Sequence, residues 1–172
     1  MTLVVNFVLF QIGWFACVLG AAHGLPWIGA LAAAAIIGLH LARATQPKLE
    51  LALVAAAAVL GALFETFLVR TGWVRFETGV LFEDMAPYWM VALWAIFATT
   101  LNVSLRWLRA QTGLAALFGA IGGPAAYYAG AKLGALELVR TGAALAAIAA
   151  GWAILTPVLL RAARRLDGYA RP

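Results

Sequence analysis

Charged side chains are scarce in this 172-residue chain, and their scarcity excludes a soluble fold. Only 11% of the residues are Asp, Glu, Lys or Arg, whereas an ordinary soluble domain has about 25%. Hydrophobic residues make up 65% of the chain, more than a soluble domain of this size could keep away from water. We therefore expect lipid to be the solvent for most of the chain.

Cysteine and histidine are scarce as well, which argues against most metal and redox sites. Cys17 is the single cysteine and lies in an apolar run, so we expect no disulfide framework and no cysteine-based metal site. His23 and His40 are expected at opposite membrane faces, where they could not share a haem or a zinc ion. His40 could still act as an acid or base near the cytoplasmic surface. No phosphate loop, Ser-His-Asp order or metal motif identifies a cofactor.

Six apolar segments approach the length that a helix needs to cross a bilayer, about 20 residues. No Ser/Gly linker or soluble appendage separates them, so residues 1–172 are expected to form a single transmembrane domain. The predicted fold class is an all-α integral membrane protein, a compact bundle of these transmembrane helices. The expected spans are 3–22, 27–42, 49–69, 88–108, 114–136 and 143–160.

Basic residues predict the orientation of the bundle. With the N-terminus in the cytoplasm, eight Lys and Arg residues fall on the inner side and four on the outer side. This excess places both termini in the cytoplasm, and the net charge of +5 then indicates contact with anionic lipid, not with nucleic acid. The inner residues are Arg43, Lys48, Arg106, Arg109, Arg161, Arg164, Arg165 and Arg171, and the outer residues are Arg70, Arg75, Lys132 and Arg140.

Glu65 is a carboxyl group expected inside the membrane. Ala57 and Gly61 precede it at steps of four, so the three residues share one stripe of the third helix. A stripe of small residues is typical of a helix-packing face. Two interpretations follow: a protonated or lysine-paired glutamate that joins two helices, or a proton carrier or catalytic acid.

The segment 119–135, GAIGGPAAYYAGAKLGA, combines small residues with a proline, two tyrosines and a lysine. Its glycines and alanines form small-xxx-small stripes, which let other helices approach closely. Pro124 has no N–H and frees the carbonyl of Ala120, so the fifth helix is expected to kink there. Tyr128 and Lys132 lie on the same stripe as the proline, towards the outer end of the helix.

Candidate site residues come from these polar positions. The catalytic candidates are Glu65, Tyr127, Tyr128 and Lys132, because Lys132 could pair with Glu65 or share a polar pocket with it and either tyrosine. The amides Asn6, Gln11 and Asn102 more often form interhelical hydrogen bonds, worth roughly 1 kcal/mol each, than substrate contacts. Trp89 is expected at the membrane interface. The substrate-binding candidates are Asn6, Gln11, Trp89, Trp94, Asn102, Gly122, Gly123 and Pro124.

Three blocks of the sequence resemble a known family. They are NFVLFQIGWFACV at 6–18, APYWMVALWAIFATTLNVSLRWL at 86–108 and the segment 119–135. The family consists of small multi-pass proteins of the bacterial inner membrane and is catalogued as a domain of unknown function. The resemblance implies genes near those of cyclopropane-fatty-acid-synthase-like methyltransferases, flavin amine-oxidase-like proteins and steroid-reductase-like membrane proteins. This neighbourhood hints at the tailoring of membrane acyl chains.

Three functional classes follow from these observations. The first is an enzyme of lipid acyl chains, or its accessory subunit, with a site that opens sideways to lipid and has the catalytic candidates as its polar end. The second is a small proton-coupled transporter that uses Glu65 and the break at Pro124. The third is a scaffold without chemistry. Expected partners are the lipid bilayer, lipid-modifying membrane enzymes and a second copy of the chain, and not nucleic acid.

Overall fold

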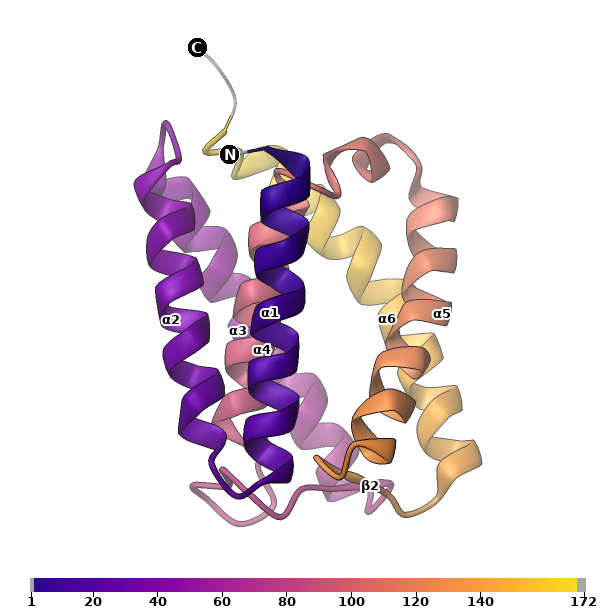
Figure 1. Cartoon of the computed structure of the whole chain (residues 1–172). Coiled ribbons are helices and arrows are strands. Elements are labelled where there is room, and N and C mark those ends of the chain that lie inside the picture. The colour runs from indigo at the N-terminus through magenta and orange to yellow at the C-terminus, as the bar shows by residue number, and fades with distance from the viewer. Residues whose placement is uncertain (1, 170–172) are drawn as a thin grey trace.

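The computed structural model describes residues 2–169 and shows six α-helices over this range (Figure 1). Arg171, which contributes to the predicted orientation, lies outside the described residues. One short 3-10 helix and one pair of two-residue strands complete the fold. The elements are α1 Leu3–Ala22, α2 Pro26–Ala42, α3 Pro47–Arg70, β1 Val74–Arg75, α4 Tyr88–Leu101, η1 Arg106–Ala110, α5 Thr112–Lys132, β2 Glu137–Leu138 and α6 Thr141–Arg165.

The helix starts follow local sequence signals. Thr2 caps α1, because its hydroxyl accepts a hydrogen bond from the N–H of Val5 at 3.4 Å. Pro26 and Pro47 occupy the first turns of α2 and α3, where a missing N–H costs nothing. Gly24 has a φ of 74° in the tight turn between α1 and α2, a conformation that glycine adopts without strain.

Four of the helices, α1, α3, α5 and α6, are long and apolar enough to cross a membrane, while α2 and α4 are shorter. The chain is therefore an all-helical membrane protein. The first turn of α1 and the last turn of α6 lie at the same end of the bundle (Figure 1). Their cytoplasmic location stays a prediction, as does the kink at Pro124, which lies inside the continuous helix α5.

The fourth helix is shorter than the predicted span 88–108, because it ends at Leu101. The reason is a polar run at its end. The hydroxyl of Thr99 donates to the carbonyl of Ile96 at 2.7 Å, and that of Thr100 donates to the carbonyl of Phe97 at 2.6 Å. Such local bonds compete with the helical pattern. The fifth helix also ends earlier than predicted, at Lys132, and the sixth continues beyond residue 160 to Arg165.

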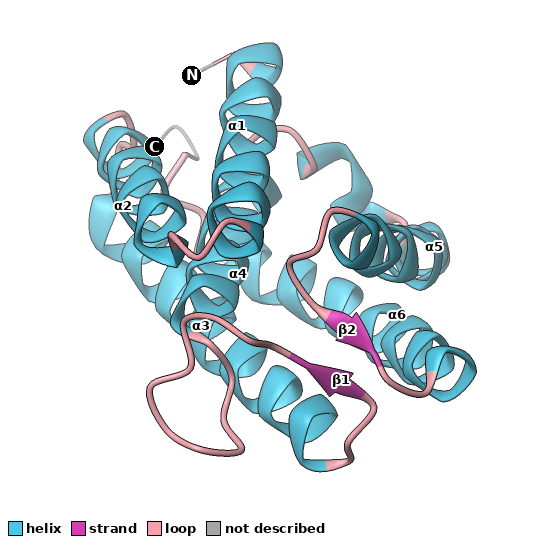
Figure 2. Ribbon diagram, turned by 60° about the horizontal axis from the view of Figure 1, so that its bottom comes forward, coloured by secondary structure: helices cyan, strands magenta, loops and turns pink. Residues whose placement is uncertain are grey.

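The helices form two groups, which meet where α6 contacts α3, α4 and η1. α1 packs on α2 and α4, and α3 packs on α4, while α5 packs chiefly on α6. At the end of the bundle opposite the first turn of α1, β1 pairs antiparallel with β2 and so joins the loops that follow α3 and α5 (Figure 2). The pairing was not predicted; across it Arg75 and Glu137 form an exposed ion pair at 2.9 Å.

Candidate functional site

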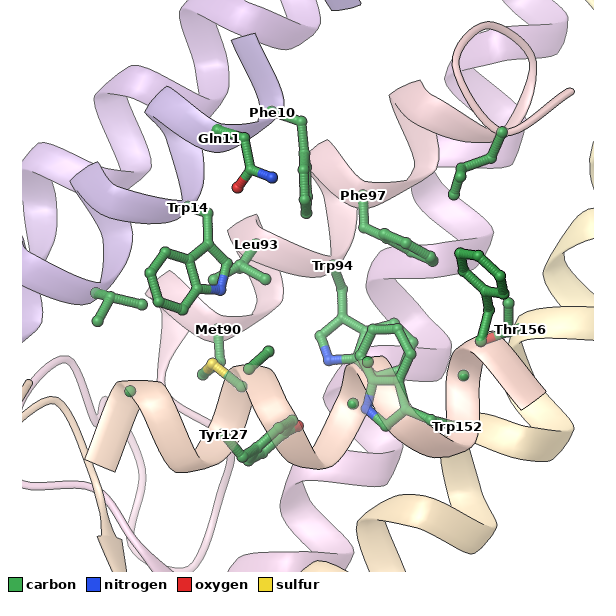
Figure 3. Close-up of a pocket in the computed structure, with 18 of the residues that line it drawn as sticks. Phe10, Gln11, Trp14, Met90, Leu93, Trp94, Phe97, Tyr127, Trp152 and Thr156 are labelled. Carbon is green, nitrogen blue, oxygen red and sulfur yellow. The ribbon is translucent and has the colours of Figure 1, made fainter. Parts of the chain in front are cut away.

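A cavity of about 490 Å³ lies between the two helix groups, and we call it the crevice (Figure 3). Its lining comes from α1, α4, η1, α5 and α6, from the turn before η1 and from the segment after α5. Nearly all of the lining is apolar. The residues are Phe7, Phe10, Gln11, Trp14, Phe15, Val18, Trp89, Met90, Leu93, Trp94, Phe97, Leu105, Leu108, Phe118, Gly119, Gly122, Gly123, Ala126, Tyr127, Gly130, Leu136, Trp152 and Thr156.

The rim of the crevice is apolar and accessible. Phe7, Phe15 and Phe118 belong to the lining, and each is about half exposed, at 53%, 49% and 50%. They stand on α1 and α5, two of the helices long enough to cross a membrane. In a bilayer the outer surfaces of such helices face acyl chains, not water. The mouth of the crevice is therefore bordered by apolar side chains of helices that are long and apolar enough to cross a membrane.

Two stacked indoles stand at the inner end of the crevice. The rings of Trp94 on α4 and Trp152 on α6 have centroids 4.5 Å apart and are tilted by only 26° (Figure 3). Glycines make room for both. A Cβ added at Gly61 would lie 2.6 Å from Cβ of Trp94, and one added at Gly123 would lie 2.6 Å from Cγ of Trp152. The small residue that precedes Glu65 on the helix stripe thus accommodates an aromatic ring.

Glu65 joins three helices beside this stack. Its side chain is fully buried on α3, and its Oε1 accepts hydrogen bonds from Nε1 of Trp94 at 2.8 Å and from the hydroxyl of Tyr127 on α5. Within residues 2–169, Oε2 of Glu65 has no hydrogen-bond partner. Tyr127 lines the crevice, so its hydroxyl connects the buried carboxyl group to the cavity. Two of the four catalytic candidates are thus brought together.

Lys132 and Tyr128 lie elsewhere, and the expected pairing of Lys132 with Glu65 is wrong. Lys132 is exposed, and its Nζ stands 5.3 Å from the ring centroid of Tyr128, which is itself 48% exposed. The reason is helix geometry. Tyr128 follows Tyr127 by 100° around α5, so when Tyr127 faces Glu65, the stripe of Tyr128 and Lys132 faces outwards.

The predicted substrate-binding residues divide into two sets. Gln11, Trp89, Trp94, Gly122 and Gly123 line the crevice, whereas Asn6, Asn102 and Pro124 are not part of its lining. Trp89 lies in the first turn of α4 and is fully buried within the protein, and its expected depth at the membrane interface stays a prediction. Its indole N–H donates to the carbonyl of Thr78 at 3.0 Å in the loop before α4.

Both asparagines form interhelical hydrogen bonds. The amide of Asn6 donates to the carbonyl of Thr99 at 3.1 Å, and its Oδ1 accepts from the hydroxyl of Ser104 at 2.6 Å. The amide of Asn102 donates to Oε1 of Glu50 at 2.6 Å and to the carbonyl of Leu166 at 2.9 Å. The more common interpretation of membrane amides, a link between helices, therefore holds for these two.

A second buried polar cluster, at the end where α1 begins, was not predicted. Nε2 of His40 lies 2.8 Å from Oε2 of Glu50, and both side chains are fully buried. Oε1 of Glu50 also accepts from the N–H of Gly168 at 2.8 Å, and the hydroxyl of Tyr169 donates to the carbonyl of His40 at 2.6 Å. The sequence contained one signal for Glu50. This residue lies on the same face of α3 as Glu65 and Ala57, because steps of three and four residues back from Glu65 through Ala57 reach it.

The segment after α6 is also held by charge. Asp167 accepts from Arg106 at 2.6 Å and from Arg109 at 2.9 Å. Burial by itself would raise the pKa of Asp167, but the hydrogen bond and charge of Arg109, with that of Arg106, bring it below its usual value. Burial, and then the negative Glu50, raise the pKa of Tyr169 to about 12. This cluster ties the tail to α2, α3 and η1, and none of its residues lines the crevice.

Comparison with known proteins gives one match. No curated protein sequence and no solved structure matches the chain significantly. A family described as "Protein of unknown function (DUF2878)" matches residues 3–158, which confirms the resemblance to a domain-of-unknown-function family. The match includes all the helices that line the crevice, apart from the last turns of α6. The chain therefore belongs to the DUF2878 family.

Proposed function

We propose that the protein takes up the apolar chain of a membrane lipid in the crevice and takes part in tailoring that chain, as an enzyme or as an accessory subunit. The observation that carries this proposal is a cavity with an apolar lining, an apolar rim and one polar end at Tyr127 and Glu65. A small-molecule site with this character suits a ligand that is mostly hydrocarbon.

The selectivity of such a site cannot come from the hydrophobic effect. A lipid chain that leaves the bilayer for the crevice exchanges one apolar environment for another. Binding then depends on how well the chain fits the walls, since each atom pair at optimal distance contributes only about 0.1–0.2 kcal/mol. The closely packed aromatic lining supplies many such pairs.

The polar end offers acid–base chemistry. In this proposal Tyr127 is the group in contact with the ligand, and Glu65 holds or takes up the proton of the tyrosine hydroxyl. Trp94 is a positioning residue, because its indole N–H fixes the same carboxyl oxygen. An ionisable group buried among membrane helices is costly and is most often retained for such a function.

We place the protein in the bacterial inner membrane with both termini in the cytoplasm. The exposed side chains of Arg161, Arg164 and Arg165 at the end of α6 support this orientation, because basic residues are enriched on the cytoplasmic side. A proton-coupled carrier is the second function considered. It would need a wet path to the central site from each side, and the apolar lining of the crevice favours lipid instead.

The test is whole-lipid mass spectrometry of a deletion strain that carries the wild-type protein or single variants. Glu65→Gln and Tyr127→Phe are expected to change the acyl-chain profile as the deletion does. Tyr128→Phe is the matched control, since this tyrosine is exposed and lies off the crevice, and it should restore the wild-type profile. An unchanged profile in the deletion strain under oxidative stress, or full restoration by Glu65→Gln at normal protein levels, would refute the proposal.

A further inference from the structure

One wall of the crevice is rich in small residues. It is formed by α5, where Gly119, Gly122, Gly123, Ala126 and Gly130 line the cavity beside the larger Phe118 and Tyr127. At Gly122 an added Cβ would meet no atom within 4 Å, so this part of the wall is bare backbone next to open space. Helix backbone without side chains presents a smooth surface that allows close approach.

The walls across from α5 are aromatic. α1 contributes Phe10 and Trp14, and α4 contributes Trp94 and Phe97. The rings contact one another: Phe10 and Phe97 have centroids 6.1 Å apart at 61°, and Phe97 and Trp152 have centroids 5.2 Å apart at 73°. Together with the stacked pair of Trp94 and Trp152, they form a continuous array of ring faces and edges.

One polar group on the lining lacks a partner. The hydroxyl of Thr156 is buried, and it has no hydrogen-bond partner in the part of the chain that the structure describes. A saturated chain offers nothing to such a donor. A double bond or an aromatic ring offers its π electrons, which accept a weak hydrogen bond.

From these observations we infer that the crevice selects a lipid whose buried part is flat, with conjugated double bonds or an unsaturated ring, over a lipid with a saturated chain. The inference rests on the proposed function and narrows its substrate class. A space between a smooth backbone wall and aromatic rings fits a flat segment, and ring faces and edges favour contact with another π system by more than area alone. A saturated chain is round in cross-section and gains no additional energy from contact with the rings.

The test uses the full chain in nanodiscs of saturated phosphatidylcholine, with a conjugated polyene fatty acid as the probe. The part of the energy transfer from tryptophan to the polyene that dilute competitors displace reports occupation of the crevice, because Trp94 and Trp152 line it. Probe dissolved in the bilayer near the exposed Trp27 and Trp107 gives only a constant background. The competitors are a saturated fatty acid and a non-fluorescent conjugated fatty acid of the same length. The conjugated competitor is expected to displace the probe at a concentration about tenfold lower than the saturated one.

Substitutions at Gly122 test whether the probe binds in the crevice. Gly122→Leu places a side chain in the open space beside α5 and should abolish most of the transfer, with Gly122→Ala giving a partial loss. The matched control is Gly38→Leu on α2, another exposed helical glycine with no atom within 4 Å of an added Cβ, and it should leave the transfer unchanged. Gly122→Ala keeps the test valid if the leucine variant does not fold.

The outcomes separate the two proposals. If the saturated acid displaces the probe as well as the conjugated one and both glycine variants weaken binding, the preference for a flat ligand is wrong and the lipid site stands. If the probe does not bind, the preference for a flat ligand is likewise wrong. If the Gly122 variants bind the probe as the wild type does, the crevice is not a lipid site and both proposals fall.

Discussion

The indole of Trp94 stacks on that of Trp152 with a centroid distance of 4.5 Å, and its N–H donates to Glu65 at 2.8 Å. One side chain therefore joins the two helix groups and also holds the polar end of the crevice. The stack connects α4 with α6, and the hydrogen bond connects α4 with α3. Packing and site chemistry consequently depend on the same residue.

The space beside Trp94 is expected to be sensitive to a single methyl group. Gly61→Ala should lower the midpoint of thermal unfolding in detergent, because overpacking a close contact costs about 1–3 kcal/mol and the new Cβ would lie 2.6 Å from Cβ of Trp94. Gly38→Ala is the control, because its Cβ meets no atom, and it should be neutral or slightly stabilising. Equal midpoints for the two variants would contradict the packing described here.

The buried side chain of Glu50, at the other end of the bundle, should contribute more to the free energy of unfolding than an exposed carboxylate. Glu50→Ala leaves His40 and the N–H of Gly168 without an acceptor, and we expect a loss of about 3–5 kcal/mol in the free energy of unfolding. Glu137→Ala removes an exposed ion pair with Arg75 and should cost about 0–1 kcal/mol. Chemical unfolding in mixed micelles measures both. A similar cost for the two would argue against the buried cluster.

Acid should weaken the attachment of the tail through Asp167. Since its pKa in the folded protein lies below the usual 3.8, the carboxylate stabilises the fold above the usual value, and this contribution is lost as the pH falls through the lower folded value. Asp167→Asn should therefore be less stable than the wild type at neutral pH, with the difference shrinking below about pH 4. The unfolding midpoint measured against pH tests this, and a constant difference would be the contrary result.

The thiol of Cys17 should not react with labelling reagents until the protein unfolds. It is fully buried where α1 packs against Gly29 of α2, and the chain has no other cysteine. A small maleimide should label it only after denaturation, while Tyr128→Cys, at an exposed position, should add one site that reacts in the folded protein. Mass spectrometry counts the labels. Rapid labelling of folded wild type would disprove the burial of this residue.

The two ends of the bundle should be accessible from opposite sides of the membrane. In intact cells, a membrane-impermeant thiol reagent should label Glu137→Cys in the loop with β2 and should not label Lys48→Cys at the start of α3, because the distribution of basic residues predicts that the termini lie inside. Both positions are exposed, so both should react after the cells are broken. The opposite pattern would reverse the predicted orientation.

Periodicity and composition were enough to predict six helices, because the helical repeat and the length needed to cross a bilayer both act locally along the chain. α1 was predicted to the residue, at Leu3–Ala22. The predicted end of the fourth helix was wrong, since the hydroxyls of Thr99 and Thr100 form hydrogen bonds to backbone carbonyls, and a hydrophobicity pattern does not reveal such bonds. The pairing of β1 with β2 joins loops far apart in the chain, and no local pattern signals it.

Composition and helical periodicity were enough to predict a lipid-embedded helical protein and the helix stripe on which Glu65 follows Ala57 and Gly61. The partners of that stripe depend on how the helices pack in three dimensions. Glu65 binds Trp94 and Tyr127, and not Lys132, because the partner of a buried group depends on how neighbouring helices are rotated about their axes. That rotation results from many weak contacts between helices, such as the stack of Trp94 on Trp152. It cannot be predicted from the spacing of residues within one helix.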